Sequence, residues 1–394
     1  MKLSYKVKNI VPSGTMAINA RVFEMKQEGA EIINLSVGEP DFDTPEHAKN
    51  SAISAIEENK TRYDKVAGLI ELRQEICRKL KEENGLEYTP GEIIVSNGAK
   101  GALTNSCFAL IDEGDEVLIP SPYWVSYPEI AKLAGGVPIY VETLRKNDFK
   151  ITAEDIKKAA TDRTKLLILC NPSNPLGTVH KRNELEDITE ICYEKGISII
   201  SDEVYERICF EDEFVSMAQV SEKAREITVV VNGLSKSVPM TGWRIGYTAC
   251  ADEAFNKAAA AFQGHISSHP STVSQWAGVE ALRRGKEYTK FMLEKYRARM
   301  EAVTLFLRKE LPQFDFIKPA GAFYIFIDIS AVKDRFTDSE SYSHAFSMAL
   351  LNEKQVAVVP GSAFGKEGYI RIAYATDMNT LMEGVRRIAD FVNL

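Results

Sequence analysis

The sequence predicts an α/β protein: a large domain with a mostly parallel seven-stranded sheet between helices, joined to a smaller α+β domain. Three observations support this. At 394 residues the chain exceeds one ordinary domain. Between about 90 and 250, short apolar runs alternate with amphipathic stretches, which is typical of parallel strands covered by helices. After about 285 the pattern changes, and a long charge-rich stretch precedes mixed strands and helices.

Seven apolar runs of the first region are expected to form the sheet: 92–96, 116–120, 137–141, 165–170, 197–202, 227–232 and 244–250. Helical periodicity separates several of them, for example at Leu185, Ile188, Ile191 and Cys192. Upstream, Thr44-Pro45-Glu46 predicts an N-cap followed by proline at the first helical position. A further helix face is marked by Leu69, Leu72, Ile76 and Leu80.

The smaller domain is expected to contain the C-terminal elements. These are a helix from Tyr288 to about Leu311, a strand at 321–327, a helix at 341–351, strands at 356–359 and 369–372, and a terminal helix from Asp377. The first 15 residues are expected to form an arm, and residues 31–37 a strand that joins this domain.

Composition excludes several functions. A net charge of -8 without a basic block argues against nucleic-acid binding. The six cysteines include no CxxC pair and the five histidines no HExxH motif, so reduced thiols are expected and a metal site is not. No apolar run has the length of a signal or membrane segment, so we expect a cytoplasmic protein without a membrane partner.

One lysine stands out. Lys236 directly follows a strand-like run that ends in Asn232-Gly233-Leu234-Ser235. A lysine at the mouth of a buried strand is costly unless its charge is compensated or its amine is used. A desolvated amine near other cations forms a Schiff base with a carbonyl substrate or with pyridoxal phosphate. A strand-end lysine lying in solvent is the alternative.

Ligands of open α/β sheets bind beyond the carboxyl ends of the strands, so polar residues there are candidates. Small residues at 96–103 open a helix and would let backbone N–H groups approach a phosphate, although this is weak evidence alone. The two asparagine amides of the segment 171–177 could donate hydrogen bonds to a phenolate or a carboxylate; the alternative is an ordinary turn rich in proline and glycine. Asp202 caps a turn or keeps a pyridine nitrogen protonated, with Tyr205 nearby as a donor.

Two further features have more than one interpretation. The aromatic residues of Ser121–Tyr127, which include Trp124, belong to the core or stack on a ligand. Arg371 lies in the middle of an apolar strand and needs a buried anion, either a structural carboxylate or that of a substrate.

In combination, these segments resemble the class I, fold-type-I pyridoxal-phosphate aminotransferases, and among them the bacterial aspartate aminotransferases of the γ subgroup. The motifs are Asn-Pro-x-Asn-Pro-x-Gly, Ser-Asp-Glu-x-Tyr and Ser-Lys followed by Gly-Trp-Arg-x-Gly, in this order. The resemblance covers essentially the whole chain, from Gly38-Glu39-Pro40-Asp41-Phe42 to Tyr369–Ala375.

The resemblance implies roles for particular residues. Lys236 would bind pyridoxal 5'-phosphate covalently and later carry a proton, and Asp202 would pair with the ring nitrogen. Tyr205 and Asn174 would bind the ring oxygen, and Trp124 would stack on the ring. The phosphate would contact Gly98, Ala99, Lys100 and Arg244, with Ser235 as a further donor and Tyr63 reaching in from a second subunit. Substrate contacts would come from Arg371, Asn174, Trp124, Lys100 and Gly38.

The resemblance also implies a homodimer with shared sites. It places an arm at 1–15, the small domain at 16–46 and 286–394, and the large cofactor-binding domain at 47–285. Two positions depart from the family pattern: Leu176 replaces a threonine, and Gly233 replaces a serine for which Ser235 is a candidate substitute.

The expected activity is ping-pong amino transfer between L-aspartate and 2-oxoglutarate. Lys100 would receive the side-chain carboxylate, with Ser13 or Thr15 of the neighbouring arm as helpers; the alternative is that Lys100 only neutralises phosphate. Val11 stands where relatives that accept prephenate carry a basic residue. An aminotransferase for alanine or aromatic amino acids, a β-lyase, and a non-catalytic sensor of the same fold are the other hypotheses.

Overall fold

The structure is a computed structural model that describes residues 2–8, 10, 14–211, 213–336 and 339–393. Its larger sheet has seven strands, as predicted. Their order is β2 (Ile93–Asn97), β8 (Ile245–Ala249), β7 (Thr228–Gly233), β6 (Ser198–Asp202), β5 (Thr164–Cys170), β3 (Glu116–Ser121) and β4 (Val137–Glu142). Only β8 runs antiparallel to its neighbours, so the expectation of a mostly parallel α/β sheet is confirmed.

Helices cover both faces of this sheet because successive side chains of its buried strands point to opposite sides. Leu166 and Ile168 pack toward one face, which is covered by α5 (Gly98–Leu110), α6 (Ser126–Leu133) and α11 (Glu253–Ile266). Leu167 and Leu169 pack toward the other. That face is covered by α7 (Ala153–Ala159) and α8 (Arg182–Glu194) at one end, and by α4 (Ile70–Asn84) and α12 (Thr272–Arg284) at the other.

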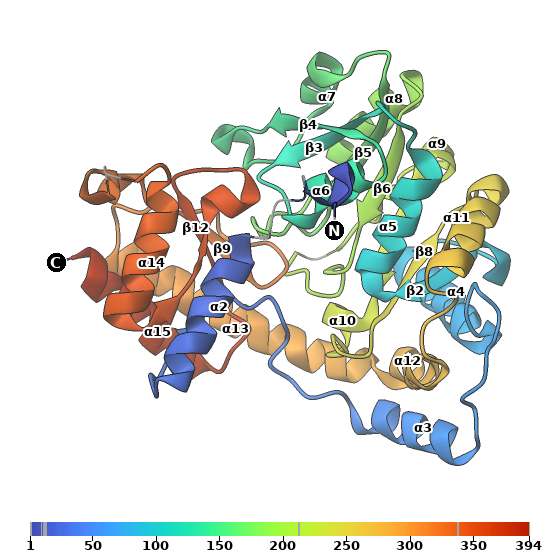
Figure 1. The fold of residues 1–394 in the computed structure, drawn as a ribbon, viewed down its shortest axis with the longest axis horizontal. Coiled ribbons are helices and arrows are strands. Elements are labelled where there is room, and N and C mark those ends of the chain that lie inside the picture. The colour runs from blue at the N-terminus through green and yellow to red at the C-terminus, as the bar shows by residue number, and fades with distance from the viewer. Residues whose placement is uncertain (1, 9, 11–13, 212, 337–338, 394) are drawn as a thin grey trace.

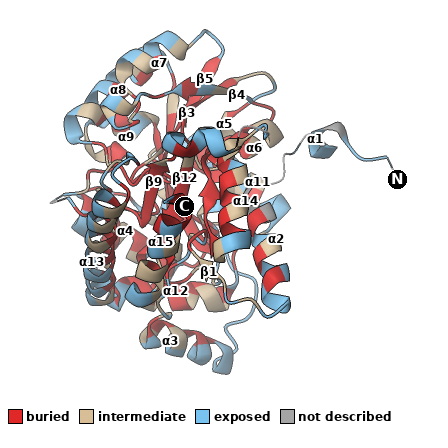
Figure 2. Cartoon of the chain, turned by 90° about the vertical axis from the view of Figure 1, so that its left-hand side faces the viewer, coloured by how far each residue is buried: buried red, intermediate tan, exposed pale blue. Residues whose placement is uncertain are grey.

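The C-terminal part has its own core. A three-stranded antiparallel sheet contains β11 (Val359–Pro360), β12 (Tyr369–Ala373) and β9 (Tyr324–Asp328), and it packs on α13 (Lys286–Glu310), α14 (Tyr342–Lys354) and α15 (Met378–Val392). The long α13 extends from the larger sheet to this core (Figure 1). Buried residues gather in the strands, whereas the outer faces of the helices are exposed (Figure 2).

The N-terminal residues join this second part. The expected strand at 31–37 is present as β1 (Ile33–Asn34), which pairs in parallel with β10 (Val356–Ala357). Ile18 and Val22 of α2 (Gly14–Gln27) pack against Leu351 and Ala357. The short α1 (Tyr5–Lys8) projects from the body of the molecule (Figure 2), where Lys6 pairs with Glu113 at 3.7 Å.

Two details differ from the predictions. Thr44 does not cap α3 (Glu46–Glu57), because Pro45 has an extended conformation and occupies the cap position. The Thr44 hydroxyl instead donates to the carbonyl of Pro239 at 2.7 Å. The single strand expected at 356–359 is two short strands, because the chain passes from the pair β1–β10 to the three-stranded sheet at Val358.

Candidate active site

A cavity of about 430 Å³ lies where the carboxyl ends of the parallel strands meet the C-terminal part. The polar residues after the strands converge there because parallel strands end at the same edge. Eleven of the predicted site residues line it: Gly38, Ala99, Lys100, Trp124, Asn174, Asp202, Tyr205, Ser235, Lys236, Arg244 and Arg371.

Two predicted residues do not line the cavity. Gly98 lies directly beside it and contacts Arg244. Tyr63 is 91% exposed and packs edge-on against His269. Val11 and Ser13 lie outside the described residues, as does the side chain of Thr15.

Lys236 is held by the short helix α10 (Leu234–Ser237), which directly follows β7. Its Nζ donates to the carbonyl oxygen of Gly38 at 2.5 Å. The pKa of Lys236 is lowered to about 8, mainly by burial; Glu39 and Asp202 oppose the shift, whereas Arg371 and Arg244 contribute to it. About a tenth of the amine is therefore neutral at pH 7, far more than for an ordinary lysine, and the neutral form is the one that a nucleophile or base requires.

Asp202, the last residue of β6, is 5% exposed. Its Oδ2 accepts a hydrogen bond from the Tyr127 hydroxyl at 2.6 Å, and its Oδ1 a longer one from the Val204 amide at 3.4 Å. Burial raises the pKa of Asp202 to about 6, although both donors and Lys236 oppose the increase. A cationic N–H group of a ligand is the natural partner of such a carboxylate.

The segment after β2 forms a narrow cradle at the start of α5. Gly98 has φ of +71°, which favours glycine, and a Cβ there would lie 2.4 Å from Nη2 of Arg244 and would displace that side chain. Its amide donates to the Arg244 carbonyl at 2.9 Å. Arg244 itself has a left-handed conformation, and its Nη1 donates to the carbonyl of Thr241.

Two exposed cations face this cradle. Lys100 lies over the Trp124 ring, with its Nζ 4.9 Å from the ring centroid. Partial desolvation and the neighbouring Arg244 lower the pKa of Lys100. Among the described residues, neither cation forms an ion pair with a carboxylate. The N-terminus of a helix with two cations that lack carboxylate partners is suited to a phosphate.

Arg371 of β12 is 4% exposed and lies against the Tyr324 and Phe364 rings. Its Nη1 donates to Oδ1 of Asn174 at 3.0 Å, and its Nη2 to the carbonyl of Ser36 at 2.7 Å. Burial lowers the pKa of Arg371. Within the described parts of the chain its Nε has no partner and no carboxylate pairs with it, so of the two interpretations of Arg371 the structural ion pair has no support there.

Both departures from the family pattern have physical explanations. Leu176 is buried in an apolar cluster with Phe149, Phe326, Val359 and Phe364, where a hydroxyl would have an apolar environment. A Cβ on Gly233 would lie 2.9 Å from the carbonyl oxygen of Ile245, so a serine does not fit there without a shift. Ser235 lines the cavity instead.

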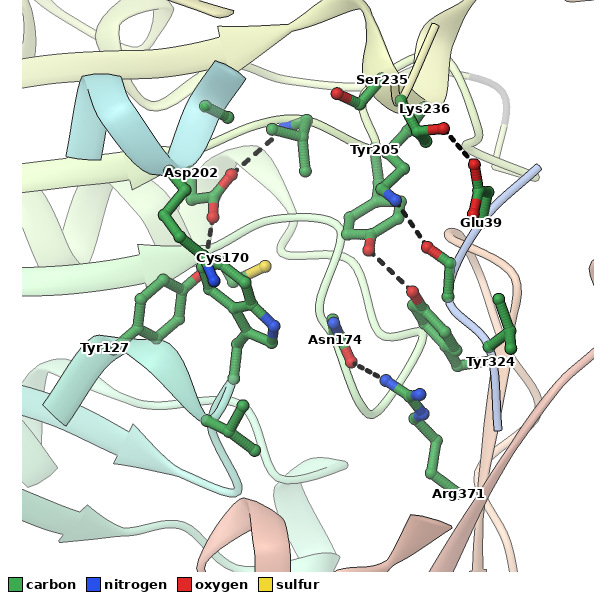
Figure 3. Close-up of a pocket in the computed structure, with 18 of the residues that line it drawn as sticks. Glu39, Tyr127, Cys170, Asn174, Asp202, Tyr205, Ser235, Lys236, Tyr324 and Arg371 are labelled. Carbon is green, nitrogen blue, oxygen red and sulfur yellow. Dashed lines mark hydrogen bonds between the residues drawn. The ribbon is translucent and has the colours of Figure 1, made fainter. Parts of the chain in front are cut away.

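The sequence analysis did not single out three residues of the site. Tyr127, in the first turn of α6, packs edge-on against Trp124, which lies just before that helix; both belong to one aromatic run, the signal that could have indicated Tyr127. Glu39 lines the cavity beside Gly38 and accepts a hydrogen bond from the Thr241 hydroxyl. Tyr324 contacts Tyr205 and Arg371 (Figure 3), and no local pattern in its apolar strand marks it.

This set of residues fits pyridoxal 5'-phosphate. The cofactor needs a lysine amine of lowered pKa, an acceptor for its ring nitrogen, donors for its ring oxygen and cations for its phosphate. Lys236, Asp202, Tyr205 and Arg244 supply these groups around one cavity. In the described residues there is no cluster of three metal ligands and no helix long and apolar enough to cross a membrane.

Comparison with known proteins agrees with this fit. Residues 30–388 match the family model described as aminotransferase class I and II. An aspartate aminotransferase of Bacillus sp. strain YM-2 is 45% identical over 99% of both chains. A probable aspartate/prephenate aminotransferase of Aquifex aeolicus is 43% identical and covers 98% of this chain and 97% of its own.

Solved structures are similar over the same length. The aspartate aminotransferase of Thermus thermophilus with maleate superimposes with a TM-score of 0.93 at 39% identity, over 99% of both chains. That of Rhizobium meliloti gives a TM-score of 0.93 at 36% identity, over 100% of this chain and 99% of its own. The chain belongs to the class I and II aminotransferases, which depend on pyridoxal 5'-phosphate.

Proposed function

We propose that this aminotransferase moves an amino group between L-aspartate and 2-oxoglutarate in two successive half-reactions. The observation that carries the proposal is Arg371, a buried guanidinium without a carboxylate partner among the described residues. Such a group requires an anion, and a planar carboxylate of an amino or oxo acid matches its geometry. The names of the relatives in Bacillus and Thermus supply the substrate.

The cofactor, when bound, withdraws electrons from the substrate carbon that loses its proton. Lys236 would hold the cofactor and then move that proton, which its lowered pKa permits. Asp202 would accept from the ring nitrogen, Tyr205 and Asn174 would bind the ring oxygen, and Trp124 would cover one ring face.

The phosphate would be bound by Gly98, Ala99, Lys100, Ser235 and Arg244, around the start of α5. Tyr63 would reach the site of a second copy, since its side chain is almost fully exposed. The enzyme would thus be a homodimer with an arm at 1–15, a small domain at 16–46 and 286–394, and a large domain at 47–285. Its six cysteines, all free, suit a cytoplasmic location.

Replacement of Lys236 tests the reaction. Lys236→Ala is expected to abolish transamination from every amino donor and to prevent covalent retention of the cofactor after denaturation. Absorbance of each half-reaction and mass spectrometry of the borohydride-reduced protein provide the readouts. Normal transamination by this variant would contradict the proposal.

Replacement of Lys100 tests the substrate. Lys100→Ala is expected to lower kcat/KM for aspartate by about tenfold to a hundredfold, because a charged hydrogen bond to the side-chain carboxylate is lost. Alanine has no such carboxylate, so its kcat/KM is the internal control and should remain nearly constant. Equal losses for both donors would mean that Lys100 serves only the phosphate.

A panel of donors and acceptors distinguishes the alternatives. Preferred turnover of alanine or of aromatic donors, or release of pyruvate from a β-substituted donor, would replace the aspartate assignment. Prephenate belongs in the acceptor panel, because the name of the relative in Aquifex includes it.

A further inference from the structure

Tyr324 connects three parts of the site. It lies at the start of β9 and is 1% exposed. Its hydroxyl is 2.9 Å from the hydroxyl of Tyr205, and Arg371 lies 4.3 Å above its ring centroid. A Cβ on Gly38 would lie 2.4 Å from the same hydroxyl, so the backbone that binds Lys236 also packs on Tyr324. Figure 3 shows Tyr324 between Tyr205 and Arg371.

Sheet register places the ring below the guanidinium. Arg371 is opposite Phe326 in the β12–β9 pair, and Tyr324 precedes Phe326 by two residues on the same face. Arg371 and Tyr324 are therefore diagonal neighbours, a separation that long and aromatic side chains span. A desolvated guanidinium over a phenol ring is held by cation–π attraction.

The hydrogen bond between the two tyrosines has a direction that matters. Each phenol hydroxyl carries one proton, so Tyr205 donates to a ligand oxygen only if it does not donate to Tyr324. The positive charge of Arg371 over the Tyr324 ring makes that hydroxyl the better donor of the pair. In the resulting chain Tyr324 donates to Tyr205, and the Tyr205 proton is directed to the ligand.

We propose that Tyr324 is a positioning residue that couples the substrate end of the site to the cofactor end. Its hydroxyl directs the proton of Tyr205 toward the cofactor's ring oxygen, and its ring supports Arg371. Tyr205 follows β6 of the larger sheet by three residues, whereas Tyr324 lies in β9, so the coupling links the larger sheet to the C-terminal part. The inference rests on the proposed function, in which Tyr205 binds the ring oxygen.

Tyr324→Phe tests the hydroxyl, because it removes one oxygen and keeps the ring. With a weaker donor at Tyr205, the ring oxygen retains its proton more strongly. The pH midpoint of the absorbance change of the bound cofactor should rise by about 0.5 unit, or about threefold in the proton equilibrium. The Kd of succinate, a dicarboxylate probe, should stay within about twofold.

The matched control is Tyr374→Phe. Tyr374 is fully buried, and its hydroxyl donates to the carbonyl of Ala322 at 3.1 Å. This variant also loses one buried hydroxyl bond, yet its cofactor midpoint should equal that of the wild type. Equal shifts in both variants would reduce the role of Tyr324 to general stability.

Tyr324→Leu tests the ring, and it should raise the Kd of succinate about tenfold through loss of the cation–π contact.

In a Tyr205→Phe background, Tyr324→Phe should no longer move the midpoint. If Tyr205→Phe shifts the midpoint and Tyr324→Phe does not, the coupling is wrong while the proposed function stands. If Tyr205→Phe has no effect either, the proposed position of Tyr205 is wrong.

Discussion

At the scale of single residues, the site shifts the pKa values of an acid and a base toward neutrality. Burial raises the pKa of Asp202 to about 6 and lowers that of Lys236 to about 8. Both shifts reflect the cost of charge in a cavity that a ligand is expected to fill. Such residues reduce the stability of the protein without its ligand.

Asp202→Asn is therefore expected to stabilise the cofactor-free protein in a pH-dependent way. The folded protein binds the Asp202 proton more tightly than the unfolded chain, so the contribution of Asp202 to stability falls as the pH rises from about 4 to 6 and stays low above. The gain from asparagine should be about 1.4 kcal/mol larger at pH 8 than at pH 5. Urea unfolding at the two values measures it, and equal gains would refute the assignment.

Residue identities were predictable where a motif or a strand end marks them. Lys236, Asp202 and Arg371 stand out because a charged side chain in or beside an apolar run needs a partner. Tyr324 could not be found this way, because a tyrosine in an apolar strand looks like an ordinary core residue. Its contacts depend on which strands meet in space, and no local pattern encodes that.

At the scale of elements, the segment that begins with the last residue of β6 has one side toward the cavity and one side buried away from it. Asp202 and Tyr205 face the cavity, whereas Glu203 and Glu206 are buried on the far side. Glu206 contacts Lys79 of α4, and its second oxygen accepts from Asn84 at 3.0 Å. Burial alone would raise the pKa of Glu206, but Lys79 and Arg207 hold it below its usual value.

Lys79→Met should destabilise the protein by about 3 kcal/mol, because it leaves Glu206 buried without its cation. Lys79→Met combined with Glu206→Leu should recover most of the loss, since both members of the buried Lys79–Glu206 pair are then replaced by apolar side chains. The control is Lys81→Met on the same helix, whose pair with Glu87 is exposed to solvent and contributes little to stability. Chemical unfolding of the wild type, the two single variants and the double variant gives the free energy of unfolding of each. Similar losses of stability for Lys79→Met and Lys81→Met would contradict the prediction.

The elements were the most predictable level of the fold. All seven strands of the larger sheet lie within two residues of the expected runs, because each is a buried apolar stretch between turns. The direction of each strand was harder to predict. A short connection joins β7 to β8, and β8 runs antiparallel to β7. The Thr44 hydroxyl donates to the distant carbonyl of Pro239 and does not cap its own helix, because tertiary packing determines its partner.

At the scale of the whole molecule, the cavity lies between the two packed parts. Asp202 ends a strand of the larger sheet, and Lys236 and Tyr205 follow such strands within three residues. Gly38 comes from the N-terminal segment, and Tyr324 and Arg371 from the three-stranded sheet of the C-terminal part. Tyr63, which the resemblance assigns to the site, projects into solvent instead. A single chain therefore lacks one of the proposed phosphate ligands.

Hybrid dimers test whether Tyr63 acts across the dimer. A hybrid of one Lys236→Ala chain and one Tyr63→Ala chain should contain one intact site, built from the lysine of one copy and the tyrosine of the other. Its activity should be about half that of the wild type, although both parent dimers are weak or inactive. A hybrid of a wild-type chain with a chain carrying both substitutions should have low activity. Its one remaining Lys236 would lie opposite the chain in which Tyr63 is replaced. If Tyr63 acted within its own chain the two results would be exchanged, so two differently tagged hybrids, purified and assayed side by side, distinguish the arrangements.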